Sequence, residues 1–194
     1  MPDRPPCKAL LREELRQRRR ALSPQNQSAA ARTVAIHIAR IPGWPTARRI
    51  ALYLASDGEI DTAPLSADCR AAEQQLFLPV IGENNLMEFA EWKPGSELAT
   101  NRYGIPEPPR AAQRCAAAAL DIIVLPLVAW DSTGGRLGMG GGYYDRALAG
   151  VNGPLLIGLA HAVQQVPQVP RDEWDIPLDY VVTDSALHCC QGHN

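Results

Sequence analysis

The sequence lacks several features that would assign it to large classes of protein. Its 194 residues contain no apolar run near the roughly 20 residues that a membrane-spanning helix needs. Residues 1–6 contain no apolar stretch of the kind that marks a secretory signal. The five cysteines form no CxxC pair, so neither a disulfide framework nor a structural zinc site is expected. We therefore expect a cytoplasmic protein without membrane association.

Lysine is scarce, and the charge is unevenly distributed. Of the 19 basic residues, only Lys8 and Lys93 are lysines. Residues 1–50 hold eleven basic and three acidic residues, a balance of +8, so the net charge of −2 leaves −10 for residues 51–194. A lysine retained in so arginine-rich a chain indicates a position that needs a compact ammonium group.

The basic amino-terminal region permits two readings that are less favoured. A nucleic-acid-binding module is one, but its basic residues are not interleaved with aromatic ones, and the acidic remainder would repel phosphate backbones. An organelle transit peptide is the other, and Asp3, Glu13 and Glu14 argue against it. We expect no nucleic-acid partner.

Two helices are expected before residue 49. Residues 8 to about 21 place Leu11 and Leu15 on one side, and Lys8 and Arg12 lie one turn apart on another. We expect the arginines at 16–20 to form a solvated basic face. Ser23-Pro24 is typical of a helix start and predicts a second helix to about residue 40.

From residue 49 onward, short apolar runs alternate with helical or loop segments. A helix is expected over about 62–74, and an ordered loop over 93–112. Pro126 cannot donate to a strand ladder, so we expect the strand that contains it to leave the sheet there. The expected strands are 49–55, 76–81, 86–92, 122–130, 155–161 and 179–183.

This alternation predicts one α/β domain over residues 1–194, a three-layer sandwich with a mostly parallel sheet. Residues 185–194 include His188, Cys189 and Cys190, a composition that could bind metal weakly, but we expect a frayed tail.

A glycine-rich segment directly follows the most apolar run and precedes a short helical pattern. Its sequence from Asp131 to Arg136 and on through Gly142 fits neither the Walker A pattern nor the dinucleotide fingerprint. Free backbone N–H groups at such a junction could still cradle a phosphate, and a glycine-rich surface turn is the alternative. Arg136 could clamp that phosphate, and Asp145 could hold Mg²⁺ or merely complement the first turn of the helix.

RLGMGGGYYDR at this segment resembles the signature of the 5-formyltetrahydrofolate cyclo-ligase family, also called 5,10-methenyltetrahydrofolate synthetases. Four further blocks follow the family's order over residues 8–184: Lys8-x-x-x-Arg12, Tyr53 with Glu59-Ile60-Asp61-Thr62, Tyr103-Gly104-Ile105-Pro106-Glu107-Pro108, and Asp179-Tyr-Val-Val-Thr183. Met139 occupies a slot that varies in the family, and Trp130 stands where Phe is common.

The resemblance implies a Rossmann-like sandwich of the type of NagB, RpiA and the CoA transferases. It also implies conversion of 5-formyltetrahydrofolate, which can carry a polyglutamate tail, and MgATP to 5,10-methenyltetrahydrofolate, ADP and phosphate. ATP would phosphorylate the formyl oxygen, and N10 of the folate would then attack the resulting iminium phosphate. Mg²⁺ is the implied cofactor, and a monomer is expected.

The resemblance also implies roles for individual residues. Lys8, Arg136 and Tyr143 are the expected catalytic residues, with Asp145 and Asp179 as Mg²⁺ ligands. The folate would contact Leu54, Glu59, Tyr103 and Tyr143, although Glu59 could instead be a turn residue and the tyrosines core aromatics. The expected ATP-binding residues are Lys8, Arg12, Arg136, Leu137, Gly138, Met139, Gly140, Gly141, Gly142, Tyr143 and Tyr144.

One further enzymatic alternative stays open, namely a related α/β enzyme that acts on sugar phosphates or CoA esters without ATP. The glycine-rich segment alone would allow it. Lys8, Arg12 and Glu59 would then have no evident purpose.

Overall fold

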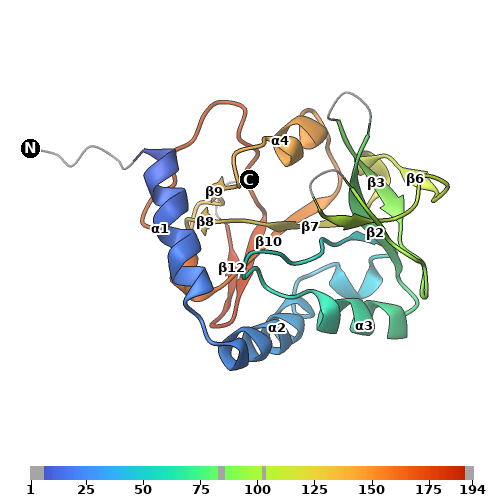
Figure 1. Ribbon diagram of the computed structural model, residues 1–194, viewed down its shortest axis with the longest axis horizontal. Coiled ribbons are helices and arrows are strands. Elements are labelled where there is room, and N and C mark those ends of the chain that lie inside the picture. Colours follow the sequence, from blue (N-terminus) through green and yellow to red (C-terminus); the bar gives the residue numbers. More distant parts are fainter. Residues whose placement is uncertain (1–6, 83–85, 102–103, 191–194) are drawn as a thin grey trace, which may run out of the picture.

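An eight-stranded sheet forms the centre of the fold (Figure 1). The computed structural model describes residues 7–82, 86–101 and 104–190. Within them, the strand order is β12-β11-β10-β7-β1-β2-β3-β6. The strands are β1 (Arg49–Ala51), β2 (Gln75–Ile81), β3 (Met87–Glu91), β6 (Arg114–Cys115), β7 (Ile122–Pro126), β10 (Leu155–Ala160), β11 (Tyr180–Thr183) and β12 (Leu187–Cys189).

The five central strands run parallel, as the continuous apolar runs predict. At the edges, β3, β6 and β12 are antiparallel to their neighbours. The expectation of a frayed tail is wrong for the residues described here, because Leu187–Cys189 pairs with β11. A turn at Thr183, whose Oγ1 accepts the amides of Ser185 and Ala186, directs the chain back along β11.

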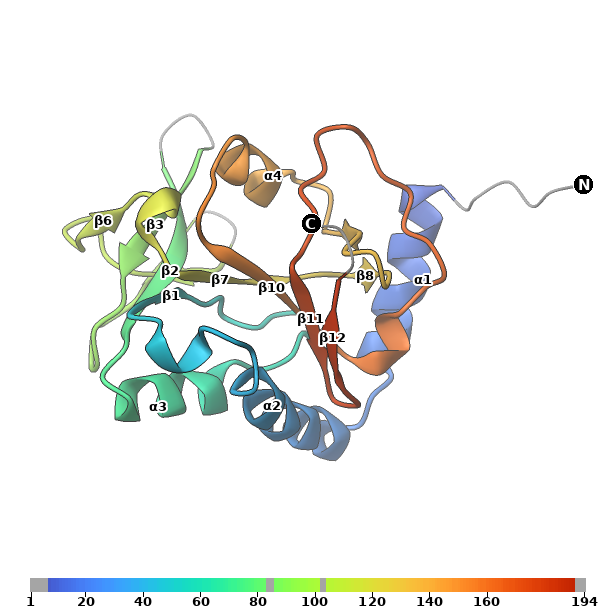
Figure 2. The ribbon, with the colours of Figure 1, turned by 180° about the vertical axis from the view of Figure 1, so that it is seen from behind.

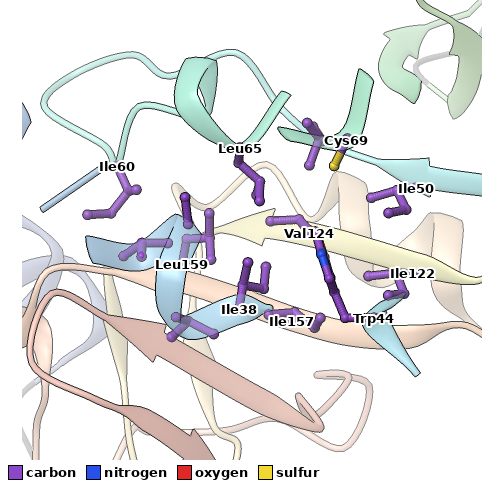
Figure 3. Packing of buried hydrophobic residues seen from close by; sticks show 14 of the residues in the cluster. Ile38, Trp44, Ile50, Ile60, Leu65, Cys69, Ile122, Val124, Ile157 and Leu159 are labelled. Carbon is purple, nitrogen blue, oxygen red and sulfur yellow. The ribbon is translucent and has the colours of Figure 1, made fainter. Parts of the chain in front are cut away.

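Helices α2 (Pro24–Ile38) and α3 (Ala63–Ala71) cover one face of the sheet (Figure 1). Ser23 caps α2 by accepting the amide of Asn26, and Pro24 occupies its first position, as the sequence predicts. Figure 3 shows the core beneath these helices, where Ile38 and Leu65 meet side chains from the strands, such as Val124 and Leu159. This buried layer fixes one side of the sheet.

The opposite face is covered by the short helix α4 (Tyr143–Leu148) and by irregular chain, as Figure 2 shows from behind. Leu148 of α4 packs in a buried cluster with residues that include Phe77, Leu125 and Trp130. The expected three-layer α/β arrangement is therefore confirmed. The layer that contains α4 is thinner than the layer of α2 and α3.

Helix α1 (Lys8–Arg20) lies at one end of the molecule, against the two-stranded sheet of β8 (Ala129–Trp130) and β9 (Arg136–Leu137) (Figure 1). Its Leu11 and Leu15 are buried in a cluster with Val128 and Leu137. The expectation of a solvated face at 16–20 is wrong for Arg19, whose side chain is fully buried. Periodicity does not reveal this, because the partners of Arg19 lie far away in the sequence.

Two expected strands are four residues shorter in the structure, whereas the others differ by one or two residues. The strand expected at 49–55 ends at Ala51, and the carbonyl of Tyr53 accepts the hydroxyl of Thr62 instead of continuing the ladder. The strand expected at 122–130 ends at Pro126, as its missing N–H predicts, and resumes as β8. The remaining elements are β4 (Ala99–Thr100), β5 (Pro106–Glu107) and the 3₁₀ turns Trp44–Thr46, Ala117–Ala119 and Ala162–Gln164.

Across the described parts of the chain, we find no helix that is long and apolar enough to span a membrane.

Candidate functional site

A cavity of about 520 Å³ opens at the carboxyl ends of the parallel strands β1, β2 and β7. This is the edge of an open α/β sheet at which ligands are expected. Cationic side chains line the cavity from α1 and from the segment that leads into α4, whereas β2 and β3 contribute apolar side chains. In Figure 1, α1 and β3 lie on opposite sides of the molecule, with α4 between them. The cavity therefore has a cationic end and an apolar end.

The glycine-rich segment divides into two parts with different tasks. Gly134 and Gly135 belong to the tight turn between β8 and β9, where Asp131 accepts the amide of Gly135 at 3.0 Å. A Cβ at Gly134 would lie 2.5 Å from the carbonyl oxygen of Leu178, so only glycine fits. Residues 138–142 instead line the cavity. The phosphate cradle expected from the sequence therefore corresponds to the second part only.

Gly140 lies at the cavity with φ +101°, a backbone conformation that residues with a Cβ rarely adopt. A Cβ built there would lie 3.5 Å from the guanidinium carbon of Arg12. Arg12 in turn donates from Nε to the carbonyl of Gly138 at 2.9 Å. Helix α1 and the glycine segment thus form one wall, in which bare backbone and a guanidinium group lie side by side.

Arg136 is the buried cation of the cavity and is only 7% exposed. Its Nη2 donates to Asp145 Oδ1 at 2.6 Å, whereas its buried Nε has no hydrogen-bond partner. Burial lowers the pKa of Arg136, although the charge of Asp145 acts against that shift. A buried N–H without an acceptor costs free energy, and Arg136 Nε is one of two such side-chain atoms among the described residues, the other being Trp130 Nε1.

The two predicted metal ligands lie at different ends of the sheet. Asp145 lines the cavity, pairs with Arg136 and accepts the amide of Ile176 at 3.2 Å. Asp179 does not line the cavity, and its carboxylate accepts the amide of Leu156 at 2.7 Å, at the amino-terminal end of β10. The prediction that both carboxylates share one metal is therefore not supported by this arrangement.

Lys8 and Arg12 both line the cavity from α1, as the four-residue spacing predicts. Lys8 Nζ lies 2.7 Å from Asp172 Oδ2 and 2.8 Å from Asp175 Oδ2. Partial burial lowers the pKa of Lys8, but the hydrogen bonds to these two carboxylates outweigh it and the pKa is raised. Lys8 is therefore firmly protonated beside the glycine segment.

Glu59 and Leu54 line the cavity after β1. The side chain of Glu59 is 9% exposed, and its Oε2 accepts the amide of Ser56 at 3.0 Å. Burial raises the pKa of Glu59, although the Ser56 amide and the charge of Arg19 oppose the shift. The turn that Asp57-Gly58 predicts is present, so Glu59 is both a turn residue and a cavity residue.

Comparison with known proteins identifies the family. Residues 5–184 match the model of the 5-formyltetrahydrofolate cyclo-ligase family. The chain belongs to this family. The 5-formyltetrahydrofolate cyclo-ligase of Escherichia coli K12 is 41% identical over 179 residues, which cover 89% of this chain and 98% of that one. The Haemophilus influenzae cyclo-ligase is 36% identical, over 87% of this chain and 92% of its own.

A solved structure supports the same assignment. The NMR structure of Aquifex aeolicus 5,10-methenyltetrahydrofolate synthetase has a TM-score of 0.84 and 32% identity to this protein. The alignment covers 96% of this chain and 94% of the Aquifex chain. The α/β fold expected from the cyclo-ligase resemblance is thereby confirmed.

Most residues that the cyclo-ligase resemblance implies meet in this cavity. Asp179 does not, and Tyr103 lies outside the described residues. Tyr143 and Tyr144 line the cavity from α4; burial raises the pKa of Tyr144, and the guanidinium of Arg146 lies 5.1 Å from the ring centre of Tyr143. The residues brought together are Lys8, Arg12, Leu54, Glu59, Arg136, Leu137, Gly138, Met139, Gly140, Gly141, Gly142, Tyr143, Tyr144 and Asp145.

Sequence reasoning missed the apolar end of the cavity and the acidic partners of Lys8. Pro79, Ile81 and Met87 come from the β2–β3 pair, where the sequence shows only ordinary strand residues. Asp172 and Asp175 lie in an irregular segment whose position no periodicity reveals. Tyr53, Ile105 and Arg146 could have been found from the sequence, because each belongs to a block that resembles the family.

Proposed function

We propose that this protein converts 5-formyltetrahydrofolate and MgATP to 5,10-methenyltetrahydrofolate, ADP and phosphate. Membership of the cyclo-ligase family supports the reaction. One observation carries the assignment of the ATP site: the buried Nε of Arg136 has no protein acceptor in a cavity lined by the glycine segment. A phosphate oxygen is an acceptor that satisfies this group and matches its charge.

The need for ATP follows from the substrate. An N-formyl group is an amide, so its carbon is a poor electrophile and its oxygen a poor leaving group. The formyl oxygen attacks the γ-phosphorus of ATP, and the bond from that phosphorus to ADP breaks. N10 then attacks the activated carbon, the carbon–oxygen bond breaks, phosphate leaves, and N10 loses its proton. Because N10 belongs to the same folate, proximity contributes up to about 7–11 kcal/mol to the closure.

The cationic end of the cavity binds the triphosphate in this proposal. The positive charges of Lys8, Arg12 and Arg136 offset the negative charge of the phosphate oxygens, which phosphoryl transfer requires to be stabilised. The backbone of residues 138–142 approaches the phosphates closely because no Cβ stands at its four glycines. Lys8 exchanges its contacts with Asp172 and Asp175 for phosphate when ATP enters.

The apolar end of the cavity binds the folate. The carboxylate of Glu59 accepts two parallel hydrogen bonds from the aminopyrimidine edge of the pterin. Leu54, Ile81 and Met87 supply an apolar wall for the ring system. Tyr143, which directly follows the glycine segment and lines the cavity, stacks on the pterin or aminobenzoyl ring.

Mg²⁺ fits the cavity through Asp145. Magnesium in phosphate sites takes one or two protein carboxylates and completes its shell with phosphate oxygens and water. No cluster of three or more Asp, Glu, His or Cys side chains suited to a metal occurs among the described residues, which agrees with a metal held largely by the nucleotide. Bound there, the ion would neutralise charge on the phosphates, while Asp145 holds it and orients Arg136.

We propose further that the protein is a cytoplasmic monomer whose folate substrate carries a glutamate or polyglutamate tail. Size-exclusion chromatography with light scattering tests the oligomeric state. Comparison of mono- and pentaglutamate substrates in the same assay tests the tail.

The reaction is tested by the near-ultraviolet absorbance of the methenyl product. With 5-formyltetrahydrofolate, Mg²⁺ and ATP, the folded protein raises this absorbance, and omission of ATP abolishes the rise. Arg136→Gln, which keeps polar atoms but loses the charge, lowers kcat/KM by about 10²-fold or more. A folded protein that gives no ATP-dependent rise would refute the proposed reaction.

A further inference from the structure

Arg19 is a fully buried cation that the roles described above do not use. It lies near the carboxyl end of α1, the helix that carries Lys8 and Arg12 at its other end. An unpaired guanidinium group in the protein interior is strongly unfavourable, so Arg19 needs partners. Those partners indicate which parts of the structure it holds together. These contacts reach the turn that leads to Glu59 and the cavity residue Leu127.

Three hydrogen bonds fix the guanidinium of Arg19. Nε donates to the carbonyl of Asp57 at 2.9 Å, and Nη2 donates to Asp57 Oδ2 at 2.8 Å. Nη1 donates to the carbonyl of Leu127 at 3.1 Å. Leu127 lines the cavity just after β7, and Asp57 belongs to the turn that ends at Glu59. One side chain thus joins α1 to the turn that ends at Glu59 and to the segment after β7.

The same guanidinium faces Glu59. Nη1 lies 3.9 Å from Glu59 Oε1, which is close enough for a charge interaction and too long for a hydrogen bond. A Cβ at Gly58 would lie 3.5 Å from Arg19 Cγ, and the carbonyl of Gly58 lies 3.2 Å from His161 Nε2.

We propose that Arg19 is a positioning residue that holds the Glu59 carboxylate ionised and oriented for the folate. The proposal rests on the proposed function, in which Glu59 binds the aminopyrimidine edge. Arg19 reaches no substrate itself, because it does not line the cavity. It acts through the Asp57–Glu59 turn and through its positive charge.

The charges around Glu59 give the proposal a direction. Arg19 favours the ionised carboxylate, whereas burial and the charge of Asp57 oppose it. Tyr53 and Tyr144 are the further titratable groups that interact with Glu59, and His161 interacts with Arg19. The pKa of both phenols is raised and that of His161 is lowered, in each case mainly by burial. All three are therefore uncharged near neutral pH. Arg19 and Asp57 are the charged residues whose substitution should change the pKa of Glu59.

The test follows the KM for 5-formyltetrahydrofolate as a function of pH. In the unaltered protein this KM rises at acidic pH as Glu59 becomes protonated. Arg19→Gln removes a cation about 4 Å away, so the rise should begin about one pH unit higher. Asp57→Asn removes an anion instead and should move the rise to lower pH. Asparagine tolerates the φ of +52° at this position.

Controls separate the proposal from a loss of packing. Arg20 also pairs with Asp57 but is half exposed, so Arg20→Gln should leave the pH dependence unchanged. Arg19→Lys keeps the charge and should restore the wild-type position of the rise, even where stability falls. If Arg19→Gln does not fold, the double variant Arg19→Gln/Asp57→Asn removes the whole ion pair, and its rise should begin at higher pH than that of Asp57→Asn alone.

Opposite shifts for Arg19→Gln and Asp57→Asn, with the KM for ATP changed less than about threefold, support the proposal. Folded variants that keep the wild-type pH dependence would overturn it. Failure of the unaltered protein to form the methenyl product would instead refute the proposed function. The two failures are therefore distinguishable.

Discussion

At the scale of residues, the cavity is lined by two features that do not stabilise the folded protein, a glycine-rich backbone and a buried cation. Bare backbone at residues 138–142 lies beside the buried guanidinium of Arg136, whose Nε lacks a partner. Neither feature improves the folded state by itself, because glycine adds chain entropy and an orphaned N–H costs free energy. Their combination is what an oxyanion-binding site requires.

Gly140→Ala tests the backbone cradle. The new Cβ stands at φ +101° and faces Arg12, so we expect strain of about 1–3 kcal/mol. We also expect about a tenfold loss in kcat/KM for ATP. Gly150→Ala is the matched control, because Gly150 also has positive φ (+70°) but nothing lies within 4 Å of its Cβ. Equal effects of the two variants on ATP kinetics would contradict the cradle.

Asp145→Asn and Asp179→Asn test the metal assignment together. Loss of the Asp145 carboxylate should raise the Mg²⁺ concentration for half-maximal rate about tenfold or more. Asp179→Asn should leave the Mg²⁺ dependence unchanged and weaken the bond to the Leu156 amide, which lowers the free energy of unfolding by about 1 kcal/mol. Titration of Mg²⁺ in the rate assay and urea unfolding measure the two effects. Identical Mg²⁺ curves for the wild-type protein and Asp145→Asn would remove the assignment.

At the scale of elements, α1 is the part of the fold whose contacts the sequence conceals most. Its length and its Leu11–Leu15 face follow from periodicity, as does the common direction of Lys8 and Arg12. The sequence does not reveal that Arg19 is buried, since its partners Asp57 and Leu127 are distant along the chain. Long-range contacts, and not local propensity, decide which arginine of a basic run becomes structural.

The attachment of α1 predicts a specific sensitivity to acid. Burial tends to raise the pKa of Asp57, but hydrogen bonds from Arg16, Arg20 and Arg19 lower it from 3.8 to about 2. The stabilisation is therefore complete above pH 3.8 and is lost as the pH falls towards about 2. Asp57→Asn should lower the free energy of unfolding at neutral pH and flatten its acid dependence in that window. Parallel acid-unfolding curves for the two proteins would contradict the prediction.

At the scale of the whole molecule, the parallel sheet and the order of its main elements could be predicted, because buried parallel strands are continuous apolar runs. The glycine segment could be placed for the same reason, since it follows such a run. The contacts that divide that segment at Gly135 could not be predicted, whereas the position of Asp179 follows from the expected strand 179–183, which begins there. The tail strand Leu187–Cys189 could not be predicted either. The features that could not be predicted depend on contacts between segments that are distant in the sequence.

The central claim is that the cavity beside residues 138–142 binds the nucleotide phosphates. A crystal structure of the protein with Mg²⁺ and a non-hydrolysable ATP analogue tests it most directly. We expect the triphosphate against the glycine segment, with a phosphate oxygen accepting from Arg136 Nε and Lys8 turned from Asp172 towards the phosphates. A nucleotide bound in another crevice, with Arg136 Nε still unpaired, would contradict the account.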